Sequence, residues 1–175
     1  GTNWSPSAAR LAADSARDHP WLEGAYLSQK LGVGAVVETA DGFLLSLCRS
    51  SGVAEGQGMM GAPGGHPEPK TNVPRSALGE PLLSGLVRQG NSFGAPTAAF
   101  IIPCSLERAE VSTLYAKGAK EAFESTALRT LPASEVIAEG GSAWFASRGL
   151  TATPSFQGAL ELWREHRLRR LEGGG

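Results

Sequence analysis

The hydrophobic pattern of the chain first predicts a β-hairpin. Apolar runs over residues 31–38 and 43–49 are separated by Thr39-Ala40-Asp41-Gly42, and an Asp-Gly pair between two such runs is a strong hairpin signal. Four more apolar runs indicate strands, and these cover residues 59–62, 82–88, 97–104 and 123–129.

Apolar residues at a spacing of three and four predict helices elsewhere. Ser105 is the expected cap of a helix over residues 106–117, with Glu107 in its first turn. A final helix starts at Thr153-Pro154 and ends near Leu171; its apolar face carries Phe156, Leu160 and Trp163, followed by Arg167 and Leu171. Two shorter helices are predicted, one over residues 7–15 and one from Pro132 to Gly140-Gly141.

Strands followed by flanking helices predict an α/β or α+β sandwich. We expect residues 1–30 to be an N-terminal helix and linker, the remnant of an upstream region, and residues 31–171 to form the domain. The first residue is Gly1 rather than Met, so we expect the chain to begin partway through a longer protein.

The composition narrows the function classes only modestly. Of 175 residues, 41% are hydrophobic and 19% are charged, and the net charge of −1 gives no field that would draw the protein to nucleic acid or to a membrane surface. No apolar run approaches the roughly 20 residues of a membrane span, so the cytoplasm is the expected location. Cys48 and Cys104 lie in apolar runs without metal-ligand spacing and are expected to be free, buried thiols.

The segment from Pro63 to Pro69, Pro-Gly-Gly-His-Pro-Glu-Pro, is the strongest candidate for chemistry. Two glycines permit a sharp turn close to a ligand, and the prolines stiffen the backbone around His66 and Glu68. The two side chains would then share one cleft. A tight surface turn explains the same residues without any ligand.

Several motifs together resemble the UDP-glucose pyrophosphatase branch of the Nudix superfamily. They are GTNWSPS at 1–7, LGVGA at 31–35, VAE at 53–55, PGGHPEP at 63–69, PLL at 81–83, PCSL at 103–106 and EAFEST at 121–126. The resemblance implies a Nudix-like sandwich in which a mixed β-sheet is flanked by helices. It also implies magnesium-dependent hydrolysis of UDP-glucose and UDP-galactose, small-molecule UDP-sugar substrates, to UMP and the sugar 1-phosphate.

By position, the resemblance assigns six substrate-binding residues: Arg49, Ala54, Gly61, His66, Glu68 and Ser155. Arg49 would pair with a phosphate or a base edge, and Ala54 would contribute backbone groups. His66 and Glu68 would bind the uridine or ribose, and Ser155 would meet an anion at a helix start. Gly61 stands where the family has an acidic nucleotide contact. A solvated strand end explains Arg49 equally well, and an ordinary first-turn residue explains Ser155.

The metal-binding part of the Nudix pattern is not found in this sequence. Counting from Gly65 places Thr71 where the first glutamate of the Nudix box belongs, and Glu80 is the only acid between Glu68 and Glu107. We therefore identify no metal ligand and no catalytic residue, expect an absent helix to expose apolar sheet surface, and expect weak or no activity. The alternatives are a non-catalytic nucleotide-sugar binder, or a protein-interaction variant that uses the basic final helix, with Arg164, His166, Arg167, Arg169 and Arg170. The sequence does not predict the oligomeric state.

Overall fold

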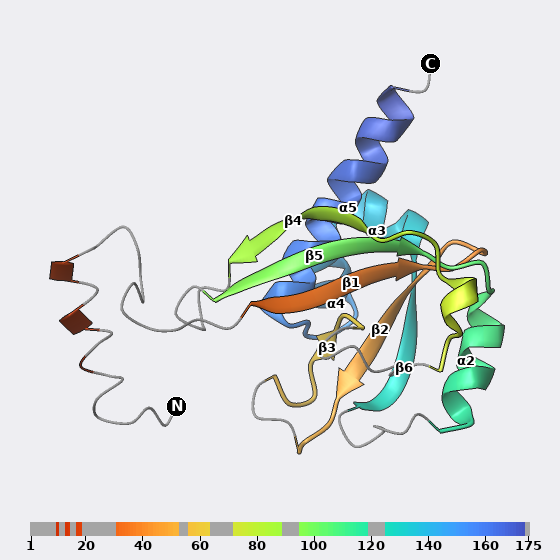
Figure 1. Ribbon diagram of the computed structural model, residues 1–175, viewed down its shortest axis with the longest axis horizontal. Coiled ribbons are helices and arrows are strands. Elements are labelled where there is room, and N and C mark those ends of the chain that lie inside the picture. The colour runs from red at the N-terminus through yellow and green to blue at the C-terminus, as the bar shows by residue number, and fades with distance from the viewer. Residues whose placement is uncertain are drawn as a thin grey trace.

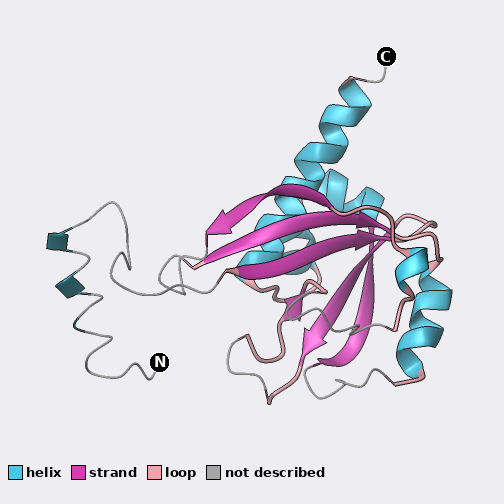
Figure 2. Ribbon diagram, in the orientation of Figure 1, coloured by secondary structure: helices cyan, strands magenta, loops and turns pink. Residues whose placement is uncertain are grey.

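A six-stranded sheet with helices on both faces forms the centre of the protein, as a computed structural model shows (Figures 1 and 2). The structure describes residues 10, 13–14, 17–18, 31–52, 56–63, 72–88, 95–118 and 125–173. The strands are β1 (Gly32–Glu38), β2 (Phe43–Arg49), β3 (Met60–Gly61), β4 (Leu82–Arg88), β5 (Pro96–Pro103) and β6 (Ser125–Pro132). The helices are α2 (Arg108–Ala116), α3 (Ala133–Glu139), α4 (Gly141–Ser147) and α5 (Pro154–Glu172), with a 3₁₀ turn at Arg75–Ala77.

The sheet is mixed, because β1 pairs with β2 antiparallel and with β5 parallel. The strand order is β3-β2-β1-β5-β4, and β6 pairs antiparallel with the whole length of β2. The predicted hairpin at Thr39–Gly42 is confirmed, with Thr39 N donating to Phe43 O at 2.8 Å. The predicted sandwich with a mixed sheet flanked by helices is confirmed as well.

The helices α3, α4 and α5 cover one face of the sheet and form the larger core. Phe156, Leu160 and Trp163 of α5 are completely buried there, as the helical spacing predicts, and they belong to the same cluster as Val36 of β1 and Ala99 of β5. The last turns of α5 run beyond the sheet (Figure 1), and Leu171 is accordingly 71% exposed.

The opposite face of the sheet is only partly covered by the described elements. Val111 of α2 packs there with Val37 and Leu45 in a smaller core. Val33 lies on the same face as Val37, since alternate residues of a strand point the same way. Leu83 and Leu86 pair with Phe100 and Ala98 of β5, in register with that face. They are 56% and 67% exposed, so part of this face is open apolar surface.

Two predicted boundaries are wrong, each for a local reason. The cap of α2 is Glu107, which forms a capping box with Glu110, whereas the Ser105 hydroxyl donates to Ala77 O. The strand predicted to end at residue 129 continues to Pro132, because its last residues still pair with β2. The short helix predicted to end at Gly140-Gly141 is confirmed as α3, which ends at Glu139 with Gly140 as its C-cap. The helix α4, which follows it directly, was not predicted.

Two other predictions concern parts of the chain outside the described residues. Most of the predicted helix over 7–15 lies outside them, as do residues 123 and 124 of the predicted strand. The domain boundary at residue 30 therefore stays a prediction.

Candidate functional site

The structure describes three of the six predicted substrate-binding residues. Arg49 is the last residue of β2, Gly61 ends β3, and Ser155 lies in the first turn of α5. Ala54, His66 and Glu68 lie outside the described residues. Although more than 100 positions separate Arg49 from Ser155 in the sequence, the end of β2 lies beside the start of α5.

The end of β2 is fixed against β3 by backbone hydrogen bonds. Arg49 N donates to Met59 O at 2.9 Å, and Gly58 N donates to Arg49 O at 3.0 Å. A Cβ atom on Gly61 would lie 3.6 Å from Cδ of Arg49, which is ordinary van der Waals distance. The Arg49 side chain therefore passes over Gly61, and these two predicted residues are neighbours in space.

The start of α5 is attached to the same short strand. Met60 N donates to Thr151 O, and Thr153 N donates to Met60 O, both at 2.8 Å. Thr153 is the N-cap: its hydroxyl oxygen accepts from Phe156 N and lies 3.3 Å from the Ser155 hydroxyl. Pro154 at the first helical position fits this arrangement, because its missing N–H would have no partner there.

Gly56 joins the two parts of the site. A Cβ atom on this residue would lie 3.4 Å from Nε of Arg49 and 3.1 Å from Cγ2 of Thr153. The guanidinium group of Arg49 and the N-cap of the 19-residue helix α5 thus both lie beside Gly56. Both carry positive electrostatic potential, and together they suit a phosphate or diphosphate. Thr153 and Gly56 were not predicted as site residues, although the Thr-Pro pair marked the helix start.

The described carboxylates do not fit a magnesium site. Glu38 accepts from Trp163 and pairs with Arg167, and the two oxygens of Glu139 are taken by Arg148. These hydrogen bonds from Arg148 lower the pKa of Glu139 below its ordinary value. Among the residues that the structure describes, no three His, Cys, Asp or Glu side chains are grouped to hold a metal ion. The magnesium that the resemblance implies therefore has no ligand set in these ranges.

Other sequence predictions can be placed on the fold. Cys48 and Cys104 are free thiols, half-buried and buried respectively. In the basic part of α5, Arg164 donates to Ile137 O, Arg167 pairs with Glu38, and Arg169 pairs with Glu165. These partners favour an ordinary solvated helix face over an interaction surface. In the described part of the chain, no helix is both long and apolar enough to cross a membrane.

Curated proteins similar to this chain carry names that match the resemblance. "Uridine diphosphate glucose pyrophosphatase NUDT22" of mouse is 34% identical over 95% of this chain and 63% of its own length. The human protein of the same name is 38% identical over 73% of this chain and 53% of its own length. "Nudix hydrolase 9" of Arabidopsis thaliana is 29% identical over 78% of this chain. The predicted resemblance to Nudix UDP-glucose pyrophosphatases is confirmed, and the chain spans between half and two thirds of these two mammalian relatives.

A solved structure of low sequence identity also resembles this chain. A Nudix hydrolase from Nitrosomonas europaea has a TM-score of 0.48 and 16% identity, over 79% of this chain and 90% of that one. No family model matches the sequence.

The alignments with the mammalian relatives contain positions at which this chain has no residue. The mouse alignment has 200 positions but takes in 95% of the 175 residues, which is about 166. The human alignment has 162 positions and takes in 73%, which is about 128 residues. Both therefore exceed the matched part of this chain by about 34 positions.

Proposed function

We propose that this relative of the Nudix UDP-glucose pyrophosphatases acts on UDP-sugars. Water would be added across the diphosphate of UDP-glucose or UDP-galactose, which gives UMP and the sugar 1-phosphate. The observation that carries the proposal is the similarity to proteins named UDP-glucose pyrophosphatase, at 34% and 38% identity. Those names favour a hydrolase over a purely structural or interaction protein.

The geometry supports a place for the diphosphate. The Arg49 guanidinium lies beside the N-cap of α5, and a Cβ atom on Gly56 would touch both. A diphosphate in this position would receive charge-assisted hydrogen bonds from Arg49, while the Ser155 hydroxyl and helix dipole would stabilise its second charge. Ala54, His66 and Glu68 would complete the site around the uridine. Gly61 would leave room for the arginine rather than supply an acid.

The proposal includes the metal ion that the resemblance implies, but not the residues that would hold it. The resemblance implies magnesium, whose ligands do not lie among the described residues, so we assign no step to it. In the sequence itself, the glutamates of the Nudix box are not found after Gly65. We therefore expect UDP-sugar binding to be better retained than turnover. A cytoplasmic location, and a separate segment before residue 31, belong to the same proposal.

The test is UMP release from UDP-glucose by the purified chain, with magnesium and with a chelator, alongside calorimetric titration with UDP. Arg49→Gln should weaken UDP binding by about tenfold or more, because one charge-assisted hydrogen bond to phosphate is lost. Arg88→Gln is the matched control, since Arg88 also ends a strand and is exposed.

Each outcome has a definite meaning. Chelator-sensitive UMP release would establish a metal-dependent hydrolase with ligands outside the described ranges. UDP binding without release would leave a nucleotide-sugar binder. If neither is observed, or if Arg49→Gln binds UDP as well as the unaltered chain, the proposed site is wrong.

A further inference from the structure

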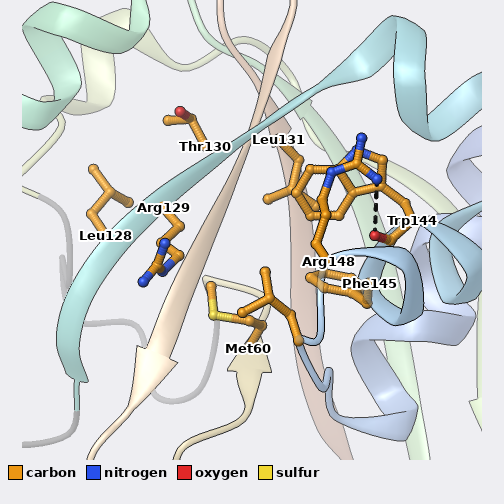
Figure 3. Close-up of a pocket in the computed structure, with 9 residues that line it drawn as sticks. Met60, Leu128, Arg129, Thr130, Leu131, Trp144, Phe145 and Arg148 are labelled. Atoms are coloured by element: carbon orange, nitrogen blue, oxygen red, sulfur yellow. Dashed lines mark hydrogen bonds between the residues drawn. The ribbon is translucent and has the colours of Figure 1, made fainter.

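Residues 151–153 lead from α4 into the start of α5, and the sheet holds them on one side. Met60 N donates to Thr151 O, and Thr153 N donates to Met60 O, both at 2.8 Å. The Met60 side chain is only 2% exposed and belongs to the main core together with Phe145 of α4, which lies near it in Figure 3. The side of the segment that faces β3 is therefore fixed by the core.

The carbonyl in the middle of this segment is held by a side chain of α5 instead. Gln157 Nε2 donates to Ala152 O at 2.9 Å, and the backbone N of Gln157 donates to Thr153 O at 3.0 Å. Ala152 is 1% exposed, so its carbonyl lies away from water and requires a donor from the protein. Gln157 thus connects the start of α5 to the two residues that precede Pro154.

The Gln157 amide is itself oriented by a contact with α4. Its Oε1 accepts from the Ser142 hydroxyl at 3.2 Å, which directs the amide nitrogen toward Ala152. One turn further along α5, Glu161 accepts from Gly141 N at 2.9 Å, so two successive polar side chains of α5 hold the start of α4. Only the first of them also holds the segment that leads to the N-cap.

We propose that Gln157 is a positioning residue of the diphosphate site, an inference that rests on the proposed UDP-sugar function. Thr153 caps α5, and its hydroxyl lies 3.3 Å from the hydroxyl of Ser155. Both residues follow directly on the carbonyl that Gln157 holds. Without the amide donor, this buried carbonyl would turn toward another partner, and the cap and Ser155 would move relative to Arg49. Hydrogen bonds to the phosphates weaken when their geometry is lost.

The test is calorimetric titration of UDP into the full chain and its variants. Gln157→Met keeps the length of the side chain but has no donor, and it should weaken UDP binding about tenfold. Glu161→Met is the matched control, because it removes the other polar contact between α5 and α4 and should leave UDP affinity unchanged. Thermal unfolding should show similar stability losses in the two variants. Gln157→Asn, whose amide is too short to reach Ala152, should reproduce the loss of affinity if Gln157→Met does not fold.

A double-mutant cycle with Ser155→Ala separates positioning from a general loss of stability. If Gln157 acts through the start of α5, Ser155→Ala should weaken UDP binding severalfold in the unaltered chain and have little further effect in Gln157→Met. Additive effects, undiminished UDP affinity in Gln157→Met, or an equal loss in Glu161→Met would overturn the inference and leave the proposed function intact. Absence of UDP binding by the unaltered chain would instead refute the proposed function, and this inference with it.

Discussion

The indole of Trp163 donates a hydrogen bond to the carboxylate of Glu38, with 3.1 Å between Nε1 and Oε2. The two residues lie 125 positions apart in the chain, and the bond connects the middle of α5 to the end of β1. Trp163 is completely buried, and the Glu38 side chain is 17% exposed. The largest fully buried side chain of the final helix is therefore also oriented by a polar contact with the sheet.

Trp163→Phe should lower the free energy of unfolding by about 2 to 4 kcal/mol, because it leaves a small cavity and removes a hydrogen bond from a mostly buried carboxylate. Arg167→Ala removes only the half-exposed ion pair with Glu38 and should cost about 0.5 kcal/mol or less. Urea unfolding of both variants measures the difference. Equal losses would mean that the ion pair, and not the indole, carries the contact.

The close packing of α5 on β4 gives a second prediction. A Cβ atom on Gly158 would lie only 2.5 Å from Cγ1 of Val87, which forces one element to move. Alanine is favoured over glycine in a helix by about 1 kcal/mol, but overpacking costs about 1 to 3 kcal/mol. We therefore expect Gly158→Ala to destabilise the protein by up to about 2 kcal/mol.

The double variant Gly158→Ala with Val87→Ala tests this reason directly. Once the valine methyl groups are absent, adding the alanine should be neutral or slightly stabilising. A double-mutant cycle from urea unfolding should then give a coupling energy of at least about 1 kcal/mol. Additive effects of the two substitutions would contradict the contact as the cause.

The hairpin and the final helix could be predicted because local and long-range signals agree in them. The Asp-Gly turn defines the hairpin without help from the rest of the chain. In α5, Thr153 and Pro154 set the start, and Phe156, Leu160 and Trp163 follow the helical period on the buried face.

The helix α4 could not be predicted, because its stabilising contacts are distant in sequence. Gly140 and Gly141 resemble a helix end, and the N-cap Gly140 has no side chain to accept a hydrogen bond. The N–H of Gly141, in the first turn, instead donates to the Glu161 carboxylate of α5 at 2.9 Å. Trp144 and Phe145 then pack into the main core.

The candidate site was predictable only in part. Arg49 and Ser155 were named from a resemblance, and nothing in their sequence neighbourhoods shows that they lie close together. Their proximity depends on β3, a strand of two residues, whose backbone bonds to Thr151 and Thr153 attach α5 to the sheet. Such a short strand carries almost no periodic signal.

Asp41 should make the stability of the protein depend on pH in the acidic range. Desolvation opposes its ionisation, but hydrogen bonds from the Thr39 hydroxyl and Arg108 N outweigh it, so the pKa of Asp41 lies below its ordinary 3.8. A lowered pKa means that the ionised form stabilises the fold. This contribution is complete above the unfolded-state pKa and is lost as pH falls through the folded-state pKa.

Asp41→Asn should therefore destabilise the protein by about 1 kcal/mol at pH 7, and the gap should close below about pH 4 as the native Asp41 becomes protonated. Urea unfolding of both proteins between pH 3 and pH 7 measures the gap. Glu165→Gln is the control, because that exposed glutamate pairs only with exposed Arg169. A gap that widens toward low pH would contradict the sign of the shift.

The open apolar face of the sheet gives a contrast between two residues of one strand. Leu86 is 67% exposed, whereas its neighbour Val87 points the other way and packs against α5. Leu86→Lys should change the free energy of unfolding by about 0.5 kcal/mol or less, and Val87→Lys should lower it by more than about 2 kcal/mol. Comparable losses in urea unfolding would mean that both faces of β4 are covered.

Gly56 allows the proposed diphosphate site to be separated from general stability. Gly56 and Gly58 both have positive φ, 66° and 71°, so alanine strains the backbone at either position by about 1 kcal/mol. A Cβ on Gly58 would meet nothing within 4 Å, whereas one on Gly56 would press on Arg49 and Thr153. Gly56→Ala should therefore weaken UDP binding severalfold, and Gly58→Ala should not, while both variants lose a similar amount of folding free energy through backbone strain.

Calorimetric titration with UDP, together with thermal unfolding, distinguishes the two effects. Equal UDP affinity of the two variants would show that the guanidinium and the helix cap do not act on the diphosphate together.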